Sequence, residues 1–102
     1  MKDLKLLYER LRALPSPALA KNVGDFALYE ALLAGCADRV VRGGLLDVSK
    51  IPVPDAETVA CTSELRARGN RTSEETVFLE YFDLLEQVRL ALVSQVAGRP
   101  VR

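Results

Sequence analysis

The sequence contains no histidine and only two cysteines among its 102 residues. A zinc site of cysteine and histidine ligands is therefore nearly excluded, because two thiolates cannot complete a tetrahedral coordination shell alone. The absence of histidine also removes the usual general base of serine and cysteine nucleophiles. We therefore expect a protein that is not an enzyme and that uses neither a metal ion nor another cofactor.

An excess of one charge and a long apolar run are also missing. The 14 basic and 14 acidic residues give a net charge of zero, which argues against a dedicated nucleic-acid binder, since such proteins neutralise many phosphates. No apolar stretch reaches the length of about 18 residues that a membrane-spanning helix needs. Charges interrupt every apolar run of the N-terminal segment, unlike those of a signal peptide. We expect a cytoplasmic protein whose Cys36 and Cys61 are buried and reduced, with a disulfide between them as the alternative.

Sustained alternation of apolar and polar residues, which is typical of a half-buried strand, is absent as well. The chain is 49% hydrophobic, which is enough for a globular core. Four segments have apolar residues at helical spacing. The sequence therefore predicts a single all-α domain over residues 1–102, built as a small antiparallel bundle of about four helices.

The first and third helices are expected to be short. The first covers about residues 3–14 and begins at Asp3, whose carboxylate can accept hydrogen bonds from the free amides of the first turn. The third covers about residues 55–68 and begins at Asp55. Its periodicity is weak, and the expected inward face is made of small residues, with Leu65 off that face. These small residues are Ala56, Val59, Ala60, Ser63 and Ala67.

The second helix is expected between Ser16, which can cap it, and Gly43, which ends it. Gly24 interrupts the apolar pattern, and Asp25 could cap a new start. One long helix and two helices with a kink are therefore both open. The expected apolar face consists of Val23, Phe26, Leu33, Cys36 and Val40, with Tyr29 and Leu32 beside it.

A long, apolar, proline-containing connection separates the second and third helices. It covers residues 43–54, which is long for a helix–helix link. Pro52 and Pro54 favour extended backbone at the residues before them. Its apolar side chains are Leu45, Leu46, Val48, Ile51 and Val53, and they need burial. Two interpretations remain open: a strap that packs over the bundle, or a ligand lid or docking segment.

The fourth helix has the strongest start signal. Thr72 and Glu75 form a capping box, in which each side chain accepts from the backbone amide of the other residue. The helix is expected to continue to Val96 and to stop at Gly98, with Pro100 beyond. Its expected core positions are Phe78, Tyr81, Leu85, Val88, Leu92 and Val96.

A second apolar strip lies beside that core face. A helix that is apolar over half its circumference is either central in its own domain or shared with a partner. The candidate partner-binding residues are Leu79, Phe82, Glu86, Arg89, Leu90 and Val93. We expect this strip to meet the same strip of a second chain across a twofold axis, with each Glu86 facing the partner's Arg89.

Two clusters of charged residues offer other functions. Arg66, Arg68 and Arg71 could bind an anion or nucleic acid, although Glu74 and Glu75 follow at the start of the next helix and would repel phosphates. The carboxylates of helix four are expected to be solvated because no histidine accompanies them. The sequence therefore predicts a non-enzymatic helical protein that binds another protein, itself first, in a regulatory or adaptor role. The alternative is a small DNA-associated regulator.

Overall fold

The computed structural model describes residues 3–97, and within them every regular element is a helix. The elements are α1 (Leu4–Ala13), η1 (Ala18–Asn22), α2 (Phe26–Val41), η2 (Val48–Lys50), α3 (Ala56–Ala67) and α4 (Ser73–Ala97). Here η denotes a short 3₁₀ helix. The all-α bundle of four helices that the sequence predicts is confirmed.

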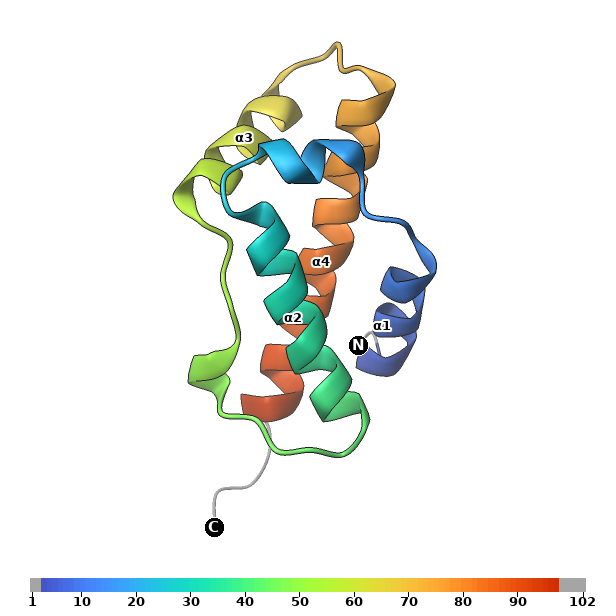
Figure 1. The fold of residues 1–102 in the computed structure, drawn as a ribbon, viewed down its shortest axis with the longest axis vertical. Coiled ribbons are helices and arrows are strands. Elements are labelled where there is room, and N and C mark those ends of the chain that lie inside the picture. Colours follow the sequence, from blue (N-terminus) through green and yellow to red (C-terminus); the bar gives the residue numbers. More distant parts are fainter. Residues whose placement is uncertain (1–2, 98–102) are drawn as a thin grey trace.

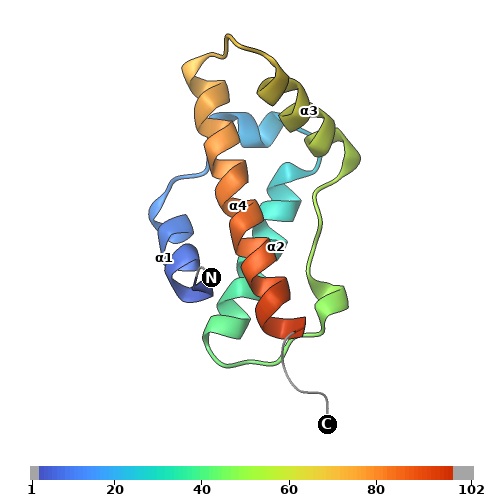
Figure 2. The ribbon, with the colours of Figure 1, turned by 180° about the vertical axis from the view of Figure 1, so that it is seen from behind.

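Helix α4 is the axis of the bundle, and it contacts all the other helices. Figure 1 shows α2 in front of α4, with α1 on one side, and Figure 2 shows α4 from behind along its full length. Helices α1 and α3 run opposite to α4, whereas α2 runs in the same direction as α4 (Figure 1). This parallel pair is possible because the segment 42–55 carries the chain back along the bundle.

The side-chain caps that the sequence predicts are present at three helix starts. Asp3 accepts from the amide of Lys5 at 3.1 Å, and Asp55 accepts from the amide of Thr58 at 3.3 Å. At α4 the capping box is closed in both directions: two hydrogen bonds of 2.9 and 3.1 Å join Thr72 and Glu75. The predicted stop of α4 at Gly98 and Pro100 lies outside the described residues.

The second predicted helix is divided in two. Its first part is the 3₁₀ helix η1, and the backbone then turns at Gly24, where φ is +43°. This left-handed conformation is one that glycine adopts without steric cost. Ser16 does not cap a helix as expected, because its hydroxyl donates to Glu30 instead. Helix α2 proper starts after Asp25 and ends at Val41, and the φ of +89° at Gly43, just beyond, is typical of the residue that follows a helix C-terminus.

The inward face of α3 differs from the predicted one. The small-residue face is wrong, because the buried residues of α3 are Thr58, Thr62 and Leu65. The threonine hydroxyls are satisfied close to their own helix: that of Thr58 donates to Asp55, and that of Thr62 donates to the Thr58 carbonyl at 3.1 Å. Because both threonine hydroxyls have acceptors, the threonine methyl groups can pack inward.

The connection between α2 and α3 is held by fewer apolar contacts than the sequence suggests. Ile51 is buried in the core, and Leu46 packs partly against it. Leu45, Val48 and Val53 are exposed, so the expectation that all five apolar side chains become buried is wrong. An extended segment that lies over a bundle presents one side inward, and the other side chains point to water.

The centre of the core is a group of aromatic rings around Phe26 on α2. Its ring centroid lies 4.9 Å from that of Phe78 and 6.2 Å from that of Phe82, both on α4. The rings of Tyr29 and Tyr81 are both 6.3 Å away. All four pairs are tilted, which is a favourable arrangement for aromatic quadrupoles. The cluster therefore joins α2 to α4 at the level where both are most buried.

The aromatic cluster predicts a large effect of one substitution. Phe26→Ala should lower the free energy of unfolding by about 3–5 kcal/mol, because it removes a fully buried ring and leaves a cavity. Leu28→Ala, two residues away on the exposed side of α2, should change it by less than about 0.5 kcal/mol. Urea unfolding followed by far-UV circular dichroism measures both. Similar losses for the two variants would contradict this account of the core.

Candidate functional site

The apolar strip predicted on α4 is divided between core and surface. Leu79 and Phe82 are only 7% and 5% exposed, and Phe82 belongs to the aromatic cluster. Val93 is half-buried and packs against the core. Leu90 is 59% exposed. Because the chain itself covers Leu79 and Phe82, the apolar side chain of this strip that a partner can reach most fully is Leu90.

The charged residues of the same strip are paired within the chain. Glu86 accepts from the Arg89 guanidinium one turn further on, with an Nη2–Oε1 distance of 2.8 Å. It also accepts from the hydroxyl of Tyr29 on α2 at 2.5 Å. The Glu86–Arg89 pair, which was expected to form between two chains, is present within α4 of one chain, and the Tyr29–Glu86 hydrogen bond joins α2 to α4.

The Glu86 carboxyl and the Tyr29 hydroxyl both have shifted pKa values. Burial raises the pKa of the Glu86 carboxyl, but hydrogen bonds from Arg89 and Tyr29 outweigh it and hold the pKa below its usual value. Burial and the hydrogen bond to Glu86 raise the pKa of the Tyr29 hydroxyl well above its usual value. At neutral pH the contact therefore joins an ionised carboxylate to a neutral phenol, and Tyr29 has no tendency to act as a base.

The three arginines of the candidate basic patch have partners within the described residues. Arg66 forms two hydrogen bonds to Asp83, and Arg68 forms an ion pair with Glu75. Arg71 donates to backbone carbonyls at the end of α3, at 2.8 and 3.0 Å. These contacts tie the α3–α4 turn to the two helices. The arrangement neutralises much of the positive charge that phosphates would need.

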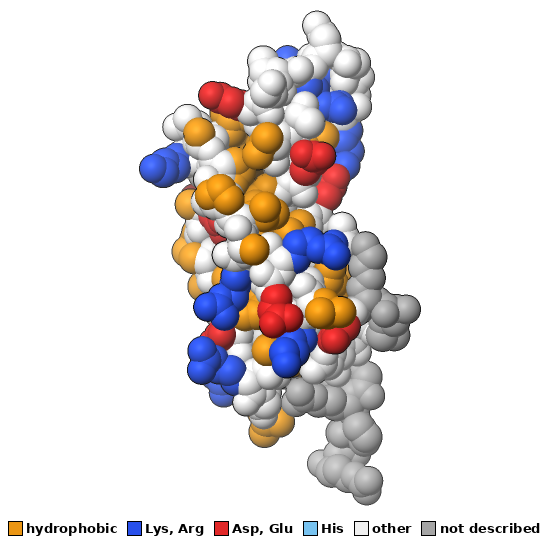
Figure 3. Space-filling model, turned by 90° about the vertical axis from the view of Figure 1, so that its right-hand side faces the viewer, with side chains coloured by type: hydrophobic (Ala, Val, Ile, Leu, Met, Phe, Trp, Pro, Cys, Tyr) orange, Lys and Arg blue, Asp and Glu red, His pale blue; other side chains and the backbone are white. Residues whose placement is uncertain are grey.

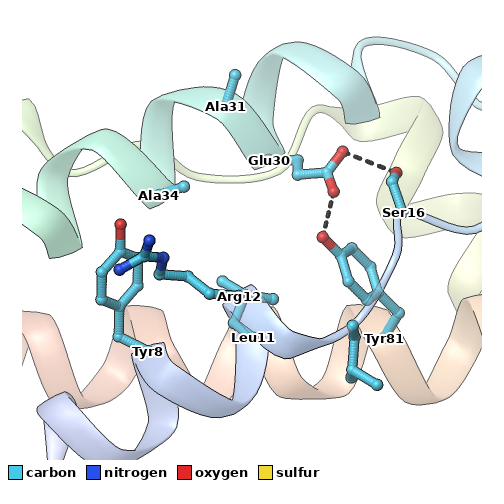
Figure 4. Close-up of a pocket in the computed structure, with 9 residues that line it drawn as sticks. Tyr8, Leu11, Arg12, Ser16, Glu30, Ala31, Ala34 and Tyr81 are labelled. Carbon is cyan, nitrogen blue, oxygen red and sulfur yellow. Dashed lines mark hydrogen bonds between the residues drawn. The ribbon is translucent and has the colours of Figure 1, made fainter.

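A groove of about 290 Å³ lies between α1 and α2, above α4 (Figure 4). Glu30 lies at one end and accepts hydrogen bonds from the hydroxyls of Tyr81 and Ser16, the latter at 3.1 Å. Burial and the hydrogen bond to Glu30 raise the pKa of Tyr81 far above its usual value. Both oxygens of Glu30 are therefore occupied, and the serine has a carboxylate beside it in place of a stronger base.

The other end of the groove is a cation–aromatic contact. The Arg12 guanidinium lies 5.7 Å from the centre of the Tyr8 ring, and Figure 4 shows the two side by side. The Tyr8 hydroxyl donates to Asp38 on α2 at 3.1 Å, and Asp38 also pairs with Arg42. All three tyrosines of the chain therefore donate to a carboxylate on a neighbouring helix. The hydrogen bonds of Tyr8 and Tyr81 link the helices that line the groove, so the polar atoms of these two side chains have a structural role.

The outward face of α2 is the surface feature that the sequence analysis missed. Every exposed residue between positions 26 and 37 is apolar or glycine. These residues are Ala27, Leu28, Ala31, Leu32 and Gly35. Leu28 and Leu32 are 58% and 51% exposed and lie one turn apart. Glu30, the only charged residue of the segment, is directed into the groove and away from this face (Figure 4).

The contrast with α1 shows how unusual this face is. Helix α1 exposes the charged side chains Lys5, Glu9, Arg10 and Arg12 beside Leu6, and Figure 3 shows side chains of both charges mixed with apolar ones over this side of the molecule. Such a charged outward face is typical of a surface helix in a water-soluble bundle. The outward face of α2 has the composition of a helix face that is covered by another element. The signal in the sequence was a segment of twelve residues, 26–37, with one charge.

The connection between α2 and α3 extends this apolar surface. Val53 is 69% exposed, and with Pro52 it lines a shallow cleft of about 160 Å³ beside Leu28 and Leu32. The cleft also borders Asp25. The apolar surface therefore consists of two neighbouring strips, one on α2 and one on the connection.

Both cysteines are free thiols, and both are only half-buried, so the expected full burial is wrong. Burial raises the pKa of Cys36 and of Cys61, and the Cys36 thiol donates a long hydrogen bond to the Lys50 carbonyl at 3.6 Å. Residues 3–97 contain no group of three or more metal-ligating side chains close enough together to hold an ion. Within the same residues, no helix has both the length and the apolar character needed to cross a membrane.

Comparisons of the chain with protein-family models, with curated proteins and with solved structures gave no match. Functional inference therefore depends on the geometry of this chain alone.

The tyrosine–carboxylate contacts predict a loss of stability in alkali. A tyrosine whose pKa is raised on folding stabilises the fold below its unfolded pKa of about 10, and this contribution is lost as the pH rises above that value. Stability should therefore fall from about pH 9.5 upwards. In the double variant Tyr29→Phe/Tyr81→Phe this fall should be much weaker. Urea midpoints measured across that range test it, and an equal fall in both proteins would contradict the prediction.

The raised thiol pKa values predict slow modification of both cysteines. The thiolate is the reactive form, so a raised pKa lowers the reaction rate at neutral pH. Ellman's reagent should react at least about fivefold more slowly with the folded chain than with the chain in urea, and it should count two thiols in urea. The single variants Cys36→Ser and Cys61→Ser assign the two rates. A fast folded-state reaction of either thiol would contradict the burial described for it.

Proposed function

We propose that this chain is a non-enzymatic protein-interaction module that associates with itself. The observation that carries the proposal is the exposed, uncharged face of α2 next to the exposed part of the connection. Contiguous apolar surface of this kind is typical of protein–protein contacts, whereas singly scattered apolar residues are not. Leu28, Leu32 and Val53 are each more than half exposed and border one cleft.

The chemistry of the polar residues also supports a role in binding. The hydroxyl groups of Tyr29, Tyr81 and Ser16 all donate to carboxylates, and the two thiols have raised pKa values. None of these five groups lies in an arrangement that would activate it as a nucleophile. The free thiols favour a reducing, cytoplasmic location as part of the same proposal.

The alternative of a DNA-associated regulator has weaker support. It depends on Arg66, Arg68 and Arg71, and each of these side chains already binds a carboxylate or a carbonyl group of the chain. Binding to phosphates would have to break these contacts. We therefore base the proposal on the apolar surface and not on the basic residues.

Sedimentation equilibrium of the wild-type chain tests the proposal. We expect a reversible dimer with a dissociation constant in the micromolar range, because a surface limited to one helix face and part of one connection is at the low end of interface sizes. Samples from about 1 µM to about 200 µM cover that range. A chain that remains monomeric at the highest concentration would contradict self-association.

A further inference from the structure

The apolar face of α2 continues at both ends into a regular pattern. Positions 25, 28, 32, 35 and 39 follow one another at intervals of three and four residues, which places them along one side of the helix. This is the spacing of the contact seam between two coiled helices. The middle of the seam is Leu28, Leu32 and Gly35, and its ends are Asp25 and Arg39.

The two ends of the seam carry opposite charges that have no partner among the residues that the structure describes. Within residues 3–97, neither the Asp25 carboxylate nor the Arg39 guanidinium forms an ion pair or a side-chain hydrogen bond. The acidic end is reinforced, because carboxylate oxygens of Asp55 and Glu57 lie against Gly24. Asp25 and Arg39 lie seven residues before and seven residues after Leu32. The seam is therefore negative at one end and positive at the other, and the two ends are equally far from the central Leu32.

We propose that this seam packs against the same seam of a second copy, with the two α2 helices antiparallel and a twofold axis close to Leu32. The proposal rests on the self-association proposed above and assigns its surface and direction. In the antiparallel arrangement each Asp25 faces Arg39 of the other copy. A parallel arrangement would place Asp25 against Asp25 and Arg39 against Arg39, so the charges select the antiparallel pair.

The shape of the seam fits the same arrangement. With the axis near Leu32, Leu28 of one copy lies opposite Gly35 of the other. Apart from its chain neighbours and the backbone of its own helix, a Cβ added at Gly35 would meet no atom of the described residues within 4 Å, so the position has open space for a large side chain of the other copy. Ala31 points away from α1 in Figure 4 and is exposed, so a second helix can approach closely beside it. The 16 residues of α2 provide a contact about 24 Å long.

Glutamate substitutions on two helix faces test the surface. Leu28→Glu and Leu32→Glu should each weaken the dimer at least about a hundredfold, since each places two charges in the apolar seam. Both side chains are more than half exposed in the single chain, so the helical fold should persist. Leu90→Glu is the matched control, because Leu90 on α4 is as exposed as Leu28 and lies outside the seam. It should leave the dissociation constant unchanged. Far-UV dichroism checks that each variant is folded.

The outcomes separate this inference from the proposed function. A wild-type dimer that survives Leu28→Glu and Leu32→Glu would overturn the assignment to α2 and leave self-association intact. Dissociation by Leu90→Glu alone would move the surface to α4. A wild-type chain that is monomeric at all concentrations would overturn both proposals.

Exchange of the charges at Asp25 and Arg39 tests whether the two α2 helices are antiparallel. Arg39→Glu should weaken the dimer roughly three- to tenfold, because it places carboxylates opposite Asp25 at both ends of the seam. Asp25→Arg should have a similar effect. The double variant Asp25→Arg/Arg39→Glu should recover most of the wild-type affinity, since opposite charges again face each other. If the dimer of the double variant is weakened by the product of the two single-variant effects, the antiparallel arrangement is overturned.

Discussion

The fold depends above all on the packing of aromatic rings around Phe26. This ring is fully buried between α2 and α4 and has four aromatic neighbours, two from phenylalanine and two from tyrosine. Helices α2 and α4 are parallel, and the long connection and α3 separate them along the chain, so no short loop holds them together. The aromatic contacts supply that link, and α1, η1 and α3 then cover the remaining sides of α4.

Polar contacts at the edge of this aromatic cluster fix the rotation of α2 and α4 about their axes. Tyr29 and Tyr81 bury their rings near Phe26 and direct their hydroxyls outward to Glu86 and Glu30, on the opposite member of the helix pair. A buried tyrosine needs such a partner, because a hydroxyl left without one costs about 1–3 kcal/mol. The two contacts run in opposite senses, one from α2 to α4 and one from α4 to α2. Together they set the rotation of α2, and that rotation leaves Leu28 and Leu32 outside.

The proposed function follows from this rotation. If α2 were turned by half a turn, Leu28 and Leu32 would be in the core and Tyr29 in water. With the aromatic residues inside, the helix retains an apolar outer face that nothing in the described chain covers. A second copy can cover it, because the seam is self-complementary in shape at Gly35 and in charge at its two ends. The cleft beside this face includes Val53 of the long connection, whereas the core itself takes up Ile51 and Leu46.

Local rules of sequence were sufficient for the presence of four helices, for the caps of α1, α3 and α4, and for most of the core face of α4. Asp3, Asp55 and the Thr72–Glu75 box act within one turn of their own position, so their effect can be read without knowledge of the fold. Sequence could not decide which of two apolar faces on α2 and α4 would be covered, because each helix is apolar over more than one side. Tertiary packing decided it: the aromatic cluster drew Phe82 and Leu79 inward and left Leu28, Leu32 and Leu90 exposed. It also turned the arginines and Glu86 toward partners in the same chain. Burial depends on what lies opposite a side chain in space, and that neighbour comes from a distant part of the sequence.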